Sequence, residues 1–157
     1  MGNGMSDGAI PARLPENETQ RLAELDSYGI LDTLSEQAYD DATALAAQIC
    51  DTPIALITLV DRDRQRFKSH VGLDVSQTPR AMAFCSYAIL DPAHPTIVPD
   101  ASNDERFRNN PLVIGDPRIR FYAGGPLVTQ SGNAMGTLCI INRVYSDARR
   151  LLLTDPN

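Results

Sequence analysis

The sequence predicts an α+β domain: a central antiparallel sheet of about five to six strands with helices packed on it. Two pairs of β-type segments are each joined by a short polar turn, which is typical of hairpins. Helical segments precede and separate these pairs, and helices that pack on a hairpin-built sheet define an α+β arrangement. The length of 157 residues fits one domain.

Two helices are predicted before the first strand. The first begins at a capping-box variant at Asn17 and runs to about Tyr28, where Gly29 supplies a stop. The second covers about 35–50 and begins at a capping box over 33–36. Apolar residues recur in it at helical spacing, and the amphipathic face they predict consists of Tyr39, Ala42, Leu45, Ala46 and Ile49.

The predicted strands alternate with turns and loops. A continuous apolar run that is rich in β-branched residues predicts a buried strand over 54–60, and a mixed-charge hairpin turn leads to its return strand over 65–71. Residues 96–98 form a short strand. The second hairpin consists of 118–129 and 134–142.

The remaining segments are a helix and two loops. The mostly apolar stretch 81–90 predicts a buried helix between a loop at 72–79 and a longer loop at 100–117, which has room for one helical turn. The pair Gly124–Gly125 indicates a strand bulge, and Gly132 belongs to the second hairpin turn. No lysine followed by serine or threonine accompanies these glycines, which argues against a phosphate-binding loop.

Charge and hydropathy exclude several functional classes. The chain has 14 Lys and Arg against 20 Asp and Glu, a net charge of -6, so neither nucleic acid nor anionic lipid is an expected partner. No apolar run reaches the ~18 residues that a membrane-spanning helix needs. The first twelve residues lack the basic start and apolar stretch of a signal peptide. The Gly, Asn, Ser and Asp content of the N-terminus predicts a flexible leader at 1–13, and the widely spaced cysteines, which suggest no disulfide framework, favour a cytoplasmic location.

Cysteine and histidine usage argues against a metal site. The three cysteines are far apart, each in an apolar stretch, and are expected to be buried free thiols: Cys50, Cys85 and Cys139. The only histidines, His70 and His94, are read as surface residues, and two imidazoles cannot build a multi-histidine metal site. No cofactor is expected.

Several motifs resemble those of GAF domains of the bacterial signalling type, which are fused to histidine kinases and diguanylate cyclases. The matching stretches lie in this order: 28–33 (YGILDT), 53–61 (PIALITLVD), 64–68 (RQRFK), 78–80 (TPR), 84–90 (FCSYAIL), 100–101 with 106–107, 110–113 (NPLV), 119–127 (IRFYAGGPL) and 136–142 (GTLCIIN).

The resemblance implies a sensory module of two-component or cyclic-di-nucleotide signalling. It implies a domain over 14–157 with a pocket on one side of its sheet. It also implies dimerisation through terminal helices, and an effector on the same polypeptide, either a histidine kinase or a cyclic-di-nucleotide synthase. The resemblance implies a long signalling helix after the last strand, and from the residues at 143–157 we expect that helix to be absent or truncated. We expect a homodimer, because Leu22 and Leu25 form an apolar stripe beyond the sheet core.

The candidate ligand site lies between loop 100–117 and strand 118–129. An apolar wall with a few convergent polar groups suits a small polar or anionic ligand, and the residues expected to supply it are Phe84, Cys85, Asp100, Arg106, Phe107, Asn110, Arg120 and Tyr122. Another interpretation stays open: Asp100 could pair with Arg106 or Arg120 to hold the long loop in place.

The sequence leaves three functions open. The first is a regulatory module that binds a small molecule or transmits a signal and catalyses nothing. The second is a redox enzyme similar to the free methionine sulfoxide reductases of the same fold, which need clustered cysteines; that clustering is not expected here. The third is a purely structural dimerisation module. Cys85 itself is expected to be buried and slow to react, because no cation lies in its own helical turn.

Overall fold

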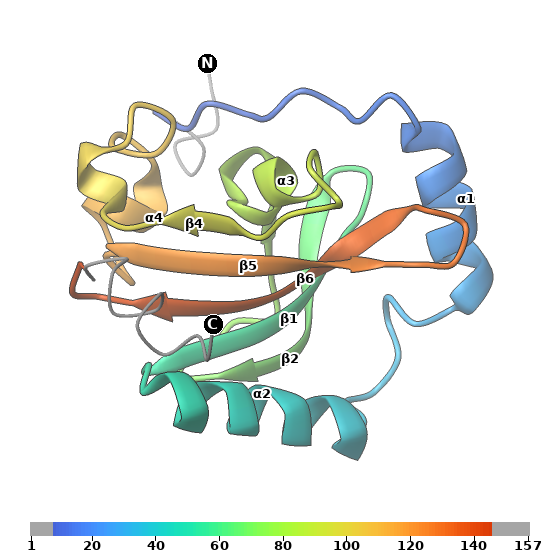
Figure 1. Ribbon diagram of the computed structural model, residues 1–157, viewed down its shortest axis with the longest axis horizontal. Coiled ribbons are helices and arrows are strands. Elements are labelled where there is room, and N and C mark those ends of the chain that lie inside the picture. Colours follow the sequence, from blue (N-terminus) through green and yellow to red (C-terminus); the bar gives the residue numbers. More distant parts are fainter. Residues whose placement is uncertain (1–7, 146–157) are drawn as a thin grey trace.

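A computed structural model describes residues 8–145 and confirms the predicted α+β fold (Figure 1). Six strands form one antiparallel sheet in the order β3-β2-β1-β6-β5-β4. Helices lie on both faces of this sheet rather than on one. In chain order the elements are α1 (Glu18–Tyr28), α2 (Gln37–Cys50), β1 (Ile54–Val60), β2 (Arg64–Val71), β3 (Gln77–Pro79), η1 (Arg80–Met82), α3 (Cys85–Ala88), β4 (Thr96–Val98), η2 (Ala101–Asn103), α4 (Pro111–Ile114), β5 (Phe121–Val128) and β6 (Ala134–Asn142).

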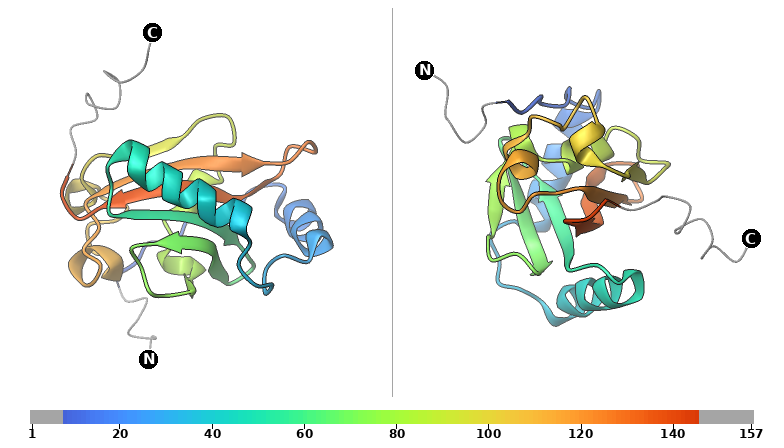
Figure 2. Two further views of the ribbon diagram at one scale, coloured as in Figure 1. Left: turned by 90° about the horizontal axis from the view of Figure 1, so that it is seen from below. Right: turned by 90° about the vertical axis from the view of Figure 1, so that its left-hand side faces the viewer.

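The layers follow from the apolar faces of these elements. Helix α2 crosses one face of the sheet, and α3 with the segments around it covers the other (Figures 1 and 2). The main core lies on the α3 side and includes Ile54, Phe84, Val98 and Tyr122. The two outermost strands of the sheet, β3 and β4, have three residues each.

The two central strands, β1 and β6, pair closely along their length. All seven residues of β1 are buried, as its apolar run predicts. Thr58 lies opposite Thr137 in the register, and their hydroxyl oxygens are 3.1 Å apart. A Cβ at Gly136 would lie 1.8 Å from the Thr58 carbonyl oxygen, so only glycine fits there. Gly124 and Gly125 pair regularly with β6, so the bulge predicted for them is wrong; the register shifts instead at Leu127/Val128.

Helix α1 has the predicted length but not the predicted cap. Gly29 ends it in the left-handed conformation. The Asn17 side chain makes no capping bond, because its amide nitrogen donates to the Asn133 side-chain oxygen at 2.7 Å. Leu22 and Leu25 are 9 % and 0 % exposed, and Leu25 packs within the domain on Leu59. The stripe they were expected to offer to a partner is therefore not available.

Helix α2 begins at Gln37, two residues later than predicted, and no side chain caps it. The Thr33 hydroxyl instead donates to the Ile30 carbonyl oxygen and accepts from the Lys68 ammonium group, which competes with a capping role. Ala46 packs on the sheet as predicted, whereas Leu45 and Ile49 are exposed.

Cys50 and Lys68 also depart from the prediction. Cys50 at the end of α2 is exposed, so only two of the three cysteines are buried as predicted. Lys68 in β2 is buried, although the mixed signs of charge over 61–68 predict an exposed surface with cross-strand ion pairs. Arg64 fits that prediction better: it pairs with Asp61 at 3.2 Å and with Asp32 at 3.0 Å. His70 and His94 are exposed.

The segments around α3 are more broken than predicted. The helix expected over 81–90 is split into η1 and the single turn of α3. The loop expected over 72–79 contains β3, and the loop expected over 100–117 contains η2 and α4. Strand β5 begins at Phe121 rather than at 118. Residues 1–7 of the expected leader and 146–157 of the expected C-terminal signalling segment lie outside the described residues.

A buried ion network joins α1 to η1. Glu18 accepts from Arg21 Nε at 2.9 Å and from Arg80 Nη1 at 2.5 Å. The two guanidinium groups also donate to the carbonyl oxygens of Val60 and Asp61, at 2.7 Å and 3.0 Å. Both arginines are buried, so a single carboxylate balances two cations in the interior.

Candidate functional site

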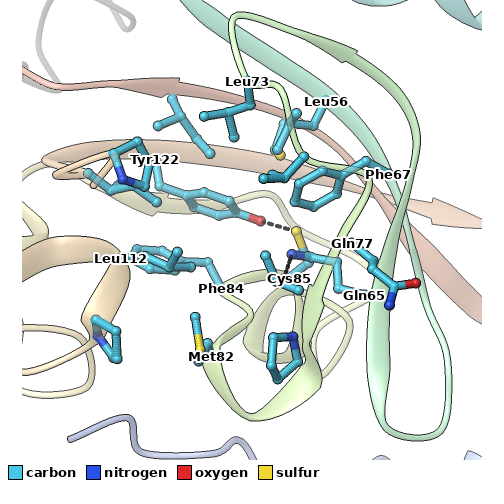
Figure 3. Close-up of a pocket in the computed structure, with 18 of the residues that line it drawn as sticks. Leu56, Gln65, Phe67, Leu73, Gln77, Met82, Phe84, Cys85, Leu112 and Tyr122 are labelled. Carbon is cyan, nitrogen blue, oxygen red and sulfur yellow. Dashed lines mark hydrogen bonds between the residues drawn. The ribbon is translucent and has the colours of Figure 1, made fainter. Parts of the chain in front are cut away.

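An apolar cavity of about 320 Å³ opens on the α3 side of the sheet. Strands β1, β2, β5 and β6 form its floor, and its walls come from the segment 73–82, α3 and the region of α4 (Figure 3). Apolar side chains dominate the lining and include Leu56, Phe67, Leu73, Met82, Phe84 and Leu112. Ligand pockets in proteins range over about 300–1,000 Å³, so the cavity suits a small molecule.

A buried thiol and two hydroxyl groups meet in the cavity wall. Cys85 Sγ lies 3.2 Å from the Tyr122 hydroxyl oxygen and 3.0 Å from Thr137 Oγ1 (Figure 3). Tyr122 reaches this position because Gly124 leaves room for it: a Cβ there would lie 2.2 Å from the Tyr122 hydroxyl oxygen. Cys139, in the middle of β6, also lines the cavity.

The two buried cysteines have pKa values shifted in opposite directions. Burial alone would raise the pKa of Cys85, but hydrogen bonds from Cys139, Thr137, Thr58 and Tyr122 outweigh burial and lower its pKa to about 7. The hydrogen bond to Cys85 and burial both hold the pKa of Cys139 well above its ordinary value. Cys85 is buried, as predicted. The absence of a nearby cation suggested an ordinary, slow-reacting thiol, but neutral hydrogen-bond donors lower its pKa instead.

Gln65 brings an unsatisfied acceptor to the same cavity. Its side chain is buried, and its amide nitrogen donates to Thr78 Oγ1 at 3.1 Å. Within residues 8–145, its Oε1 atom has no hydrogen-bond partner. A buried carbonyl oxygen without a donor is destabilising by about 1–3 kcal/mol. The atom itself has no surface open to the cavity, so an N–H or O–H group of a ligand would reach it once the Gln65 amide turned toward the cavity.

An aromatic stack supports the cavity from behind. The rings of Phe84 and Phe107 are stacked with centroids 4.0 Å apart, and Phe84 also contacts Tyr122 at 5.2 Å. The Arg106 guanidinium lies 4.8 Å from the Phe107 ring centroid on the other side and forms an ion pair with Asp104 at 2.8 Å. The stack thus fixes Phe84 against the cavity.

The structure separates the eight predicted site residues into two groups. Phe84, Cys85 and Tyr122 line the cavity. The other five do not: Asp100, Arg106, Phe107, Asn110 and Arg120. The cavity borders the predicted location through residues 111–119 and Tyr122, and extends from there to the segment 73–82.

Those five residues hold the long loop together. Asp100 caps η2 by accepting from the Ser102 backbone N–H at 3.0 Å. The Asn110 amide donates to the Met82 carbonyl oxygen, and its side-chain oxygen caps α4. Arg120 Nη1 donates to the carbonyl oxygens of Val113 and Ile119, each at 3.0 Å. The expected Asp100 ion pair with Arg106 or Arg120 is therefore wrong, although Arg120 does tie the loop down.

Two residues of the site were missed at the sequence level. Gln65 stands two positions before Phe67, so period-2 alternation places both on one face of β2, and this signal could have found it. Cys139 lies opposite Leu56 in the sheet. It shares the cavity lining with Cys85, which is 54 positions away in the sequence (139 − 85), and no local pattern reveals this. The expectation that the cysteines would not cluster is wrong for this pair.

The sheet and its cavity define an α+β domain built around a small-molecule-sized space. The chain belongs to the GAF domain family, whose sequence pattern matches residues 35–155. It is 47% identical over 129 residues to a cyclic di-GMP phosphodiesterase of Pseudomonas aeruginosa, a match that covers 82% of this chain and 22% of that protein. The chain thus spans about a fifth of this relative's length.

Solved structures support the fold alone. One is the GAF domain of an Acinetobacter phosphoenolpyruvate-protein phosphotransferase, with a TM-score of 0.55 and 19% identity over 87% of this chain and 85% of that one. Another is a type II free methionine-R-sulfoxide reductase of Thermoplasma acidophilum, with a TM-score of 0.58 and 12% identity over 82% and 86%. In the described part of the chain, no helix is long and apolar enough to cross a membrane.

Proposed function

We propose that this GAF domain is a regulatory module whose cavity binds a small, largely apolar molecule that carries one hydrogen-bond donor. The observation that carries this proposal is the buried, unsatisfied Oε1 of Gln65 in an otherwise apolar cavity. Such a pocket recognises its ligand by apolar contact and orients it by a single polar group. On this reading the domain binds and signals, and it catalyses no reaction.

The charge of the cavity favours a neutral ligand over the anionic one expected from the sequence. Among the described residues that line it, none is Arg, Lys or His, and Asp116 is the acidic one. A carboxylate or phosphate would enter without a cation to pair with, which is strongly unfavourable in an apolar site. Arg120, the candidate anion-binding residue, donates to backbone carbonyls instead.

For the effector, the Pseudomonas aeruginosa relative favours a cyclic di-GMP phosphodiesterase. The resemblance alone implied a histidine kinase or a cyclic-di-nucleotide synthase. The relative at 47% identity is a phosphodiesterase, and the match covers only 22% of it, which leaves most of that protein outside the match. We therefore propose a phosphodiesterase as the output of the longer protein.

A pair of probes of equal size tests the ligand proposal. Indole carries one N–H donor, and benzofuran has the same shape without it. We expect indole to raise the melting temperature of the domain more than benzofuran does, because ligand binding stabilises the folded state. A single neutral hydrogen bond contributes about 1 kcal/mol, roughly a fivefold difference in Kd.

Two variants of cavity glutamines show which side chain selects the donor. Gln65→Leu should bind both probes equally, whereas Gln77→Leu, a matched change in the more exposed glutamine of the cavity wall, should keep the preference for indole. If neither probe binds wild-type protein, the ligand proposal fails. Equal binding of both probes to wild-type protein would show that Gln65 does not select a hydrogen-bond donor.

One observation favours a second function. Cys85 and Cys139 lie in one cavity, and clustered cysteines are what a sulfoxide reductase of this fold requires. Turnover of free methionine sulfoxide by the purified domain with a dithiol reductant would establish the enzyme and exclude the purely regulatory proposal. The homodimer and the cytoplasmic location stay predictions, and light scattering at high protein concentration tests the former.

A further inference from the structure

Two buried thiols line the same cavity. Cys85 is the first residue of α3, and Cys139 lies in the middle of β6. Their exposed fractions are 2 % and 1 %, and both line the cavity. Cys85 Sγ lies 3.0 Å from Thr137 Oγ1, and Cys139 is two positions further along β6, so strand alternation places it on the same face as Thr137. The cavity is therefore the route by which a small reagent meets this pair.

The surroundings of Cys85 favour its thiolate. Thr137 Oγ1 and the Tyr122 hydroxyl oxygen lie 3.0 Å and 3.2 Å from Cys85 Sγ. Thr58 stands behind Thr137 at 3.1 Å and extends the network. These donors, with the thiol of Cys139, lower the pKa of Cys85 to about 7 against the raising effect of burial. The thiolate is the nucleophilic form of cysteine.

We propose that Cys85 and Cys139 form a dithiol that hydrogen peroxide oxidises to a disulfide inside the cavity. Cys85 is the attacking thiol and Cys139 the resolving one. This proposal goes beyond ligand binding, and it requires only that the cavity admits a neutral molecule as small as hydrogen peroxide. Cys85 takes the attacking role because two hydroxyl groups, of Thr137 and Tyr122, lie within hydrogen-bond distance of its sulfur.

The reaction has two steps that balance. The Cys85 thiolate attacks one peroxide oxygen, the O–O bond breaks, and the departing hydroxide takes up a proton as water, which leaves a sulfenic acid on Cys85. Cys139 sulfur then attacks the Cys85 sulfur. The S–S bond forms, the S–O bond breaks, and hydroxide leaves with the Cys139 proton as a second water. Hydrogen peroxide is reduced by two electrons and the two thiols are oxidised by two.

Oxidation would join two layers of the domain. The disulfide would tie α3 to β6 and change the hydrogen bonds that Cys85 Sγ shares with Thr137 and Tyr122. The polarity of the cavity wall would change with it. Cys50 cannot take part within one molecule, because α2 and α3 lie on opposite faces of the sheet (Figure 1).

Mass spectrometry of the whole chain tests the proposal. Cys50→Ser removes the exposed thiol and serves as the background for all variants. This protein is treated with hydrogen peroxide at pH 7, quenched, unfolded and alkylated with N-ethylmaleimide. We expect both thiols to become unreactive to alkylation, with a mass lower by two hydrogen atoms, and dithiothreitol to restore them. Two thiols that stay alkylatable under conditions that oxidise Cys50 in wild-type protein overturn the proposal.

Two further variants separate the roles of the sulfurs. With Cys139→Ser, oxidation of Cys85 should stop at the sulfenic acid, which dimedone traps. With Cys85→Ser, oxidation of Cys139 should be slower by ~10-fold or more, because its thiol remains protonated. Dimedone labelling of Cys139 at the wild-type rate in the second variant overturns the assigned roles. If either variant fails to fold, disulfide formation in the Cys50→Ser protein still tests the proposal.

Discussion

Replacement of Glu18 by Gln tests the ion network between α1 and η1. The change keeps the shape of the side chain and removes the charge that Arg21 and Arg80 share. Both arginines are buried, so two guanidinium groups are left without a counter-ion. Breaking a buried ion pair is destabilising by about 3–5 kcal/mol. Because the Glu18 side chain is 14% exposed, we expect the lower end, ~3 kcal/mol by the same principle.

Thermal unfolding followed by circular dichroism measures this effect. For a chain of this size, 1 kcal/mol corresponds to roughly 2–4 °C in Tm, so Glu18→Gln should lower the Tm by ~6–12 °C. Asp32→Asn is the matched control. Asp32 pairs with Arg64 at 3.0 Å, but the two side chains are 73% and 25% exposed, and such pairs contribute less than ~1 kcal/mol.

The same variant changes the acid stability of the domain. Burial raises the pKa of Glu18, but hydrogen bonds from Arg80 and Arg21 outweigh it and hold the pKa below its ordinary value of 4.5. A carboxyl group with a lowered folded pKa stabilises the fold above its unfolded pKa, and this stabilisation is lost as pH falls through the folded value. Wild-type protein should lose more stability below pH 4.5 than Glu18→Gln does. A Tm of the variant within ~2 °C of wild type at pH 7 would refute the reasoning, since it corresponds to at most ~1 kcal/mol.

Three further predictions concern the sheet, the loop and the thiol. Gly136→Ala places a Cβ against the Thr58 backbone and should destabilise by ~3 kcal/mol or more in chemical denaturation, whereas Gly125→Ala, whose nearest atom lies at 3.9 Å, should be tolerated. Arg120→Ala loses two bonds to carbonyl oxygens and should destabilise by about 2 kcal/mol; an unchanged melting curve would instead favour a ligand role for this residue. The rate of Cys85 modification by methyl methanethiolsulfonate should rise through pH 7, whereas a free cysteine requires about pH 8.5, and a profile centred at that higher value would contradict the thiolate.

The central strands could be predicted because their signal is local. The apolar runs of β1 and β6 are too short for a helix and are bounded by turn residues, and the predicted bounds match the structure. The stretch 81–90 shows the limit of this method. It is apolar over most of its length, so it carries no clear periodicity, and its split into η1 and α3 reflects packing around the cavity. Thr33 failed as a cap for a similar reason, because Lys68 from a distant strand contacts it.

The site could be predicted only where one strand or helix determines the direction of a side chain. Phe84, Cys85 and Tyr122 face the core and line the cavity. Long polar side chains were harder to place, because their ends reach partners in any direction. Arg120 turns back to carbonyl oxygens of its own loop, and Gln65 turns inward without a complete set of partners.

The short outermost strands of the sheet have a consequence for crowding. Each edge, β3 or β4, has only three residues, and Pro79 in β3 has no N–H to offer. Long exposed edges invite strand addition and fibre growth, and short or proline-bearing edges discourage both. Many copies of this domain could therefore be held side by side without fusing their sheets. Association would depend on surface side chains, which can vary from one protein to another while the backbone scaffold stays the same.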